Sequence, residues 1–137
     1  MKKIVYISII STLFFSYSCS QKPSSFNESN HRSNYRLINE LITITKSNFK
    51  LPYDLGNGIQ WIDIINEDDI NIVTIYYIKD ISIIPTLPSR EESIQKIKED
   101  AGMTNMIQEG VNFIYRYYIN EGDSLIKEDS YNLTDID

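Results

Sequence analysis

The sequence predicts a single α+β domain with the element order α-β-β-α-β-β, in which helices pack on one face of a mainly antiparallel four-stranded sheet. Two segments carry apolar residues at helical spacing. Each precedes a pair of segments rich in Ile, Val and Tyr that a short polar connection joins. These patterns occupy residues 35–137, about 100 residues, a length that supports one hydrophobic core and is too short for two.

The first predicted helix has an apolar face that runs from Ile38 to Phe49. Ser33 or Asn34 can cap its start, because these side chains accept hydrogen bonds from the first turn. Leu51-Pro52 ends it, since the residue before a proline avoids helical backbone angles. Asn57-Gly58 then marks a turn.

The first predicted hairpin pairs residues 59–65 with residues 70–79. Both segments are dominated by Ile, Val, Tyr, Trp and Thr, and residues 66–69 form a short acidic connection. A proline-bearing loop then leads to the second helix. This helix starts at Ser89, which forms a capping box with Glu92, and we expect Gly102 to bend or interrupt it.

The second predicted hairpin pairs residues 111–119 with residues 125–133 through a turn at residues 120–123. Alternate positions of its first strand are apolar or aromatic, as expected for a strand with one covered face. The inward set is Val111, Phe113, Tyr115, Tyr117 and Ile119. The last strand is more polar, which predicts an edge position.

The first 18 residues have the features of a secretory signal peptide. Lys2 and Lys3 precede the apolar run Ile4–Phe15, which is short for a permanent membrane span. The competing interpretation, a buried N-terminal strand or helix, does not account for the paired lysines. It also leaves unexplained the change to Ser- and Asn-rich sequence over residues 19–34, a composition typical of a flexible tether.

The single cysteine, Cys19, directly follows Ser18 just after the apolar run. Here the sequence resembles the lipobox of bacterial lipoproteins, in which the cysteine carries diacylglycerol and the leader is cut before it. Ser16 departs from the leucine usual in that family. The resemblance implies a lipid anchor on Cys19, and Ser20 after it implies the outer membrane, facing the periplasm. The alternative, cleavage by ordinary signal peptidase, leaves a free thiol.

The run from Met106 to Tyr117 joins a helix end and Gly110 to a strand with alternating tyrosines, and Leu51-Pro52 follows the first helix. In these features the chain resembles small, exported, uncharacterised α+β proteins of Gram-negative bacteria. Such proteins often carry a cysteine near the position of Ala101 that pairs with another near the C-terminus, and this chain has neither. The resemblance implies a fold and a compartment but no activity.

The charge of the chain excludes one class of partner. Of 13 Lys and Arg residues, two are lost with the leader, so 11 face 19 Asp and Glu, a net charge of −8 against −6 for the whole chain. Such an excess of acid argues against nucleic-acid binding, which depends on phosphate neutralisation. It allows a basic protein of the cell envelope as partner, although an excess of acid more often serves solubility, and it leaves the oligomeric state open.

The residues that catalysis requires are scarce, so we expect no enzyme and no cofactor. The one histidine, His31, lies in the predicted tether, and acylation of Cys19 leaves no thiol. The glycines fit neither nucleotide-binding pattern. The carboxylates of the two predicted turns could hold Ca²⁺ if the turns were adjacent, but acidic residues are common in turns for local reasons. We therefore predict no metal.

Two surfaces remain as candidates for partner binding. The acidic turns supply Glu67, Asp68, Asp69, Glu121 and Asp123. Adjacent strand tyrosines point to opposite faces, so Tyr77 or Tyr76, and Tyr118 or Tyr117, must point away from the helices, and Tyr77 and Tyr118 are the candidates. The sequence thus favours a non-enzymatic, protein-binding envelope lipoprotein, with an inhibitor or immunity-type role as one form. The alternative is a domain that binds glycan or a small ligand through its strand aromatics.

Overall fold

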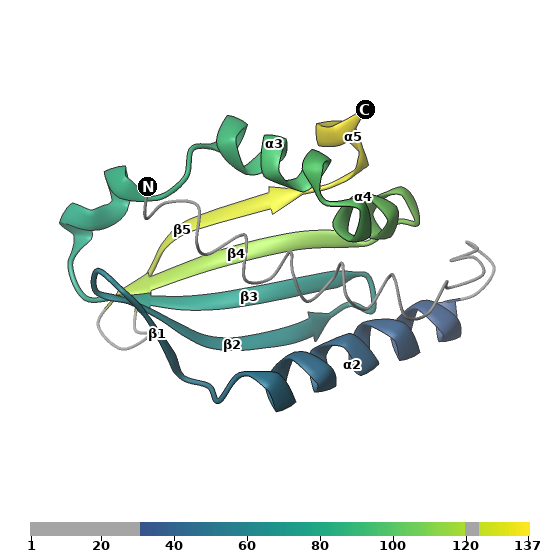
Figure 1. Ribbon diagram of the computed structural model, residues 1–137, viewed down its shortest axis with the longest axis horizontal. Helices are drawn as coiled ribbons and strands as arrows, with labels where there is room; N and C mark the ends of the chain where they lie inside the picture. Colours follow the sequence, from purple (N-terminus) through teal and green to yellow (C-terminus); the bar gives the residue numbers. More distant parts are fainter. Residues whose placement is uncertain (1–30, 120–123) are drawn as a thin grey trace.

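The protein is an α+β domain, as the sequence predicted, and it is built on one mixed sheet (Figure 1). The computed structural model describes residues 31–119 and 124–137. Its helical elements are α2 (His31–Asn48), the 3-10 helix η2 (Ile81–Thr86), α3 (Arg90–Glu99), α4 (Ala101–Gln108) and α5 (Leu133–Ile136). Its strands are β1 (Tyr53–Gly56), β2 (Ile59–Glu67), β3 (Asn71–Ile78), β4 (Asn112–Ile119) and β5 (Ser124–Tyr131).

The sheet has five strands in the order β1-β2-β3-β4-β5, not the predicted four. Both predicted hairpins are present as antiparallel pairs, and β5 lies at an edge, as expected. The central pair, β3 with β4, is parallel, because η2, α3 and α4 carry the chain back across the sheet between them. The additional strand β1 has four residues and pairs with β2 across the predicted Asn57-Gly58 turn.

The helices differ from the prediction at two places. Helix α2 begins at His31, so Ser33 and Asn34 lie inside it rather than at its cap. The second predicted helix is two helices, and the break falls at Asp100 instead of Gly102. The Asp100 carboxylate accepts a hydrogen bond of 2.9 Å from the backbone N–H of Met103 and so begins α4. The capping box of Ser89 and Glu92 is confirmed.

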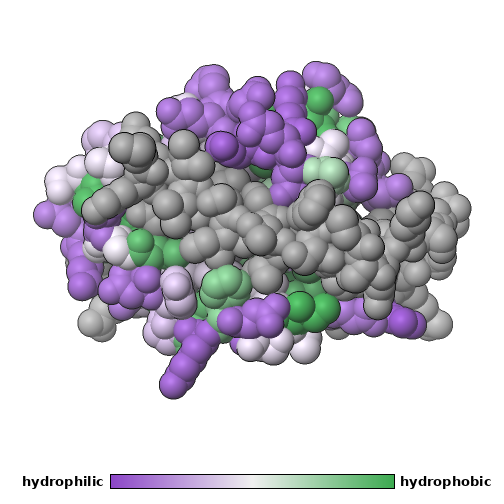
Figure 2. Space-filling model, in the orientation of Figure 1, coloured by the Kyte–Doolittle hydropathy of each residue, from purple (hydrophilic) through white to green (hydrophobic). Residues whose placement is uncertain are grey.

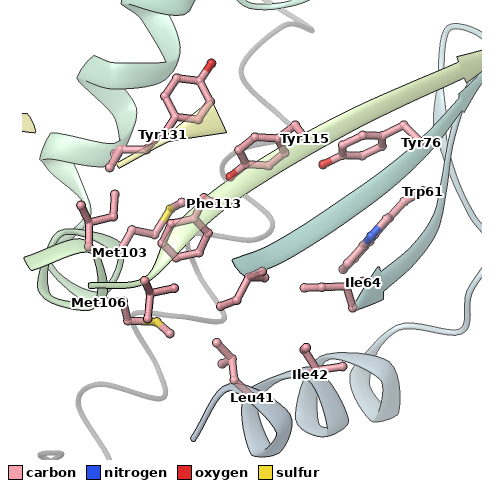
Figure 3. Packing of buried hydrophobic residues seen from close by; sticks show 14 of the residues in the cluster. Leu41, Ile42, Trp61, Ile64, Tyr76, Met103, Met106, Phe113, Tyr115 and Tyr131 are labelled. Atoms are coloured by element: carbon pink, nitrogen blue, oxygen red, sulfur yellow. The ribbon is translucent and has the colours of Figure 1, made fainter. Parts of the chain in front are cut away.

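The hydrophobic core lies on one face of the sheet. Helices α2, α3 and α4 contribute buried residues to it, and η2 and α5 add partly buried ones. The sheet contributes aromatic side chains from four strands, which Figure 3 shows in a row above α2 and beside α4: Trp61, Tyr76, Phe113, Tyr115 and Tyr131. Val111, Phe113, Tyr115 and Tyr117 are buried, so the predicted inward face of β4 is confirmed at these positions, whereas Ile119 is only half-buried.

The opposite side of the sheet, here called the open face, is covered by none of the helices within residues 31–119 and 124–137, since all of them join the core. Strand alternation places Tyr77 of β3 and Arg116 and Tyr118 of β4 on this face. The helical side is different in character, because α3 presents a largely hydrophilic surface (Figure 2). The open face carries two half-buried tyrosines, Tyr77 and Tyr118.

Candidate functional site

Arg116 lies near the centre of the open face. Its Nη1 and Nη2 atoms donate hydrogen bonds of 2.7 and 2.8 Å to the two carboxylate oxygens of Glu67 on β2. Its Nε atom donates a third, of 2.7 Å, to Glu128 on β5. Such a two-pronged arginine–carboxylate contact is among the stronger polar interactions in proteins, and it fixes the orientation of both partners. The arginine thus ties together strands β2, β4 and β5.

The position of Val73 suggests a structural effect of the ion pair between Arg116 and Glu67, here called the Arg116 bridge. It lies on the open face of β3, beside Ile65 of β2 and Ile114 of β4. The strand register places it between Glu67 and Arg116, and its side chain is completely buried although it is not part of the main core. We infer that the ion pair shields Val73 from water. The open face therefore has a small apolar layer of its own beneath its polar groups.

The charges of this cluster respond to their contacts. Hydrogen bonding to the Arg116 guanidinium lowers the pKa of Glu67 below its ordinary value. The same hydrogen bonds to Glu67 and Glu128 raise the pKa of Arg116. Glu67 and Arg116 therefore remain charged near neutral pH.

Tyr77 and Tyr118 are brought together by the parallel pairing. They are direct register partners on β3 and β4, and both are half-buried. Gln60 of β2 lies opposite Tyr77, and Leu125 of β5, which is 49% exposed, lies opposite Tyr118. The result is a lateral row in which two tyrosines are flanked by an amide on one side and an exposed leucine on the other.

The predicted acidic hairpin has two different parts. Asp68 and Asp69 are exposed, and both have positive φ angles, of 58° and 63°. Glu67 is held by Arg116 and is not a freely available charge. Glu121 and Asp123 lie outside the described residues. The structure therefore places Asp68 and Asp69 at the free tip, while Glu67 belongs to the open face.

The part of the chain that the structure describes gives little support for metal binding or for acid–base catalysis. No three His, Cys, Asp or Glu side chains of residues 31–119 and 124–137 come close enough to hold a metal ion. Tyr115 has a buried hydroxyl with no hydrogen-bond partner among these residues, and burial raises its pKa. A neutral phenol so deeply buried does not serve as an acid or base near neutral pH.

Arg116 is the residue of this candidate site that sequence reasoning missed. The alternating pattern of β4 assigned it to the outward set, where a charged residue is expected in contact with water. An arginine between two tyrosines in an aromatic strand was the available signal, since a charge in such a place needs a partner. Its main partner is 49 positions away in the sequence, so the pattern of β4 did not identify it.

These features define a domain with a five-stranded mixed sheet, one layer of helices and one open face. No protein-family profile matches the sequence, and no curated protein matches it significantly. The fold is similar to that of two pilotins of type 2 secretion systems. EpsS of Vibrio vulnificus matches with a TM-score of 0.61 and 15% identity, over 81% of this chain and 98% of that one.

The second pilotin, AspS of Vibrio cholerae, matches with a TM-score of 0.56 and 7% identity, over 78% of this chain and 95% of its own. A protein of Pseudomonas aeruginosa described as secreted matches with a TM-score of 0.66 and 7% identity, over 81% and 99% of the two chains. At these identities the likeness shows the fold. None of the described helices is long and apolar enough to cross a membrane.

Proposed function

We propose that this chain is a non-enzymatic lipoprotein of the cell envelope that acts by binding a protein of a secretion machine, as a pilotin does. The observation that carries the proposal is the shared fold: 81% of this chain superposes on 98% of one type 2 secretion pilotin. The likeness extends over almost the whole of that protein, so the two chains share one fold.

The N-terminal sequence supports the same function. The lipobox-like segment that ends at Cys19 implies acylation, and lipid chains anchor a domain stably once two are present. In this proposal the anchor lies in the outer membrane and the domain faces the periplasm. The excess of carboxylates favours a basic partner, and an inhibitor or immunity-type role would use such a surface in the same way.

In the experiment, the tagged full-length lipoprotein is first purified from its own cell envelope. Each recombinant envelope component of the cell's secretion systems is then tested for direct binding to the purified protein. The proposal expects saturable binding to one component, retained in a variant with the exposed helix residue Glu91→Gln as control. Binding to none of the components, by protein that is folded and membrane-anchored, would rule the proposal out.

A glycan-binding role is the second candidate, and one observation favours it. Tyr77 and Tyr118 are neighbours in register on the open face, with the Gln60 amide beside them. Aromatic rings that lie side by side can stack against the apolar faces of sugar rings while the amide supplies a donor and an acceptor. A panel of envelope oligosaccharides, titrated against the protein by calorimetry, tests it. Heat of binding that disappears in the Tyr77→Leu/Tyr118→Leu variant would support this role.

A further inference from the structure

The open face and the β2–β3 hairpin tip form one continuous surface with two different ends. At one end, strand β2 finishes at Glu67 and the tip carries the exposed Asp68 and Asp69. At the other end lies the row of Tyr77, Tyr118 and their flanking residues, and Tyr77 follows the acidic residues of the tip by eight to ten positions. Arg116 lies between the two ends and contacts Glu67.

Charge is distributed unevenly over this surface. Glu67 and Glu128 pair with Arg116, and Asp68 and Asp69 at the tip are exposed, so acidic residues gather toward the hairpin end. Asp54 on β1 lies opposite Gln60, in the row of Tyr77. Three of the acids lie at the hairpin end. Lys79 lies at the other end, two residues beyond Tyr77, with its side chain against Gly58.

The tyrosine end has the composition of a protein-binding surface. Tyrosine and arginine are enriched at the centres of interfaces, and a well-packed apolar layer beneath them favours tight contact. Here Leu125 is 49% exposed beside Tyr118, and Val73 lies completely buried beneath the Arg116 bridge. The bridge also fixes Arg116 before any partner arrives, so less conformational entropy is lost on binding.

We propose that the open face binds an extended or helical segment of a protein partner that has lysines or arginines at one end and apolar residues at the other. The basic end lies on Asp68 and Asp69, and the apolar end lies on Tyr77, Tyr118 and Leu125. This inference rests on the proposed protein-binding function and adds to it the surface, the chemistry of the partner and the direction in which the partner lies. The charge asymmetry selects a protein segment over a neutral glycan, which would gain nothing from the acidic tip.

Site-specific photo-crosslinking of the full-length lipoprotein in cells tests the surface directly. The photoreactive residue p-benzoylphenylalanine replaces Tyr118 at one end, Asp69 at the other, and Glu91 on the exposed surface of α3 as a control. The proposal expects the same protein to cross-link from Tyr118 and Asp69 but not from Glu91. Mass spectrometry should find the Asp69 cross-link in a basic stretch and the Tyr118 cross-link in an apolar stretch of that protein.

A matched charge variant completes the experiment. Asp68→Asn/Asp69→Asn should reduce the cross-link from position 118 at low salt on the order of tenfold, because charges at the edge of an interface act mainly on the association rate. A partner that cross-links from position 91 and from neither open-face position leaves the protein-binding function intact and overturns this inference. Cross-links from none of the three positions overturn both. An oligosaccharide that competes away the position-118 cross-link assigns the face to glycan instead.

Discussion

Arg116 and Glu67 form a two-pronged ion pair although they are 49 positions apart in the sequence and lie on strands that are not neighbours. The pair crosses β3, the strand between them. The two halves of the sheet meet through the parallel pairing of β3 with β4, and the bridge adds a side-chain link across the same junction. Val73, which is completely buried, lies on β3 between the two residues in the strand register.

Removing the arginine should destabilise the protein. Arg116→Ala leaves Glu67 and Glu128 without their common partner and uncovers Val73, so we expect the free energy of unfolding to fall by about 1–3 kcal/mol. Urea unfolding followed by circular dichroism measures it. Lys46→Ala is the control, because it removes an ion pair with Asp63 in which both side chains are more than one-third exposed. A loss no larger than that of the control would contradict the structural role of the bridge.

The stability that Glu67 contributes should depend on pH in a defined direction. Contact with Arg116 lowers the folded-state pKa of Glu67 below 4.5, the ordinary value that applies to the unfolded chain. The unfolded chain therefore binds this proton more tightly, and the contribution is complete above pH 4.5. It is lost as the pH falls through the lower, folded-state pKa. The difference in unfolding free energy between wild type and Glu67→Gln should accordingly be present at neutral pH and shrink in acid. A difference that grows on acidification would show that folding does not lower the pKa of Glu67.

The unpartnered hydroxyl of Tyr115 predicts a stabilising substitution. The ring packs against Tyr76 and Tyr131, with centroid distances of 6.4 and 5.8 Å, while the buried hydroxyl lacks a partner among the described residues. Tyr115→Phe keeps the ring and removes the unsatisfied group, so unfolding free energy should rise by roughly 0.5–2 kcal/mol. Tyr131→Phe is the matched control. It loses a hydrogen bond with Ser93 and should instead be destabilised by about 1 kcal/mol. Equal effects of the two substitutions would argue against an orphaned hydroxyl.

Local features of the fold were predictable from the sequence, because the interactions behind them are local. The capping box of Ser89 and Glu92 spans four residues, and the inward position of Tyr115 follows from alternation along one strand. Strand β1 was not predicted, because four residues that follow a proline and end in glycine carry no periodic pattern. The parallel pairing of β3 with β4 joins distant segments, and no local signal specifies it.

The same distinction applies to the candidate site. Asp68 and Asp69 were predicted as exposed turn residues, and the structure confirms that they are exposed. Glu67 was grouped with them because it is adjacent in sequence, yet its partner comes from the other hairpin. The row that unites Tyr77 with Tyr118 likewise depends on the register between β3 and β4. Sequence patterns therefore identified the residue types of the surface, and the long-range pairing determined which of them act together.

The lipid anchor can be tested independently of the fold. Cys19 lies outside the described residues, so the prediction rests on its sequence context. Replacing Cys19 by Ala should abolish metabolic labelling with palmitate and release the domain from the membrane fraction, because each buried methylene of an acyl chain contributes about 0.8 kcal/mol to membrane binding. Ser20→Ala, which keeps the cysteine, is the control. Unchanged labelling in the Cys19 variant would remove the basis for anchoring.

Salt dependence should separate protein binding from glycan binding at the open face. If the face binds a basic protein segment, Asp68→Asn/Asp69→Asn should slow association and flatten its dependence on salt, since screened charges act over about 10 Å at 0.1 M ionic strength. Tyr77→Leu/Tyr118→Leu should then weaken binding equally at low and high salt. If the face binds glycan, the tyrosine variant loses binding and the aspartate variant does not, at any salt concentration. Surface plasmon resonance with both variants, at low and high salt, distinguishes the two outcomes.

Tyr77→Phe/Tyr118→Phe keeps both rings and should retain binding in either case. Wild-type binding by the aspartate and the leucine variants alike would exclude the open face and direct the search to the helical side.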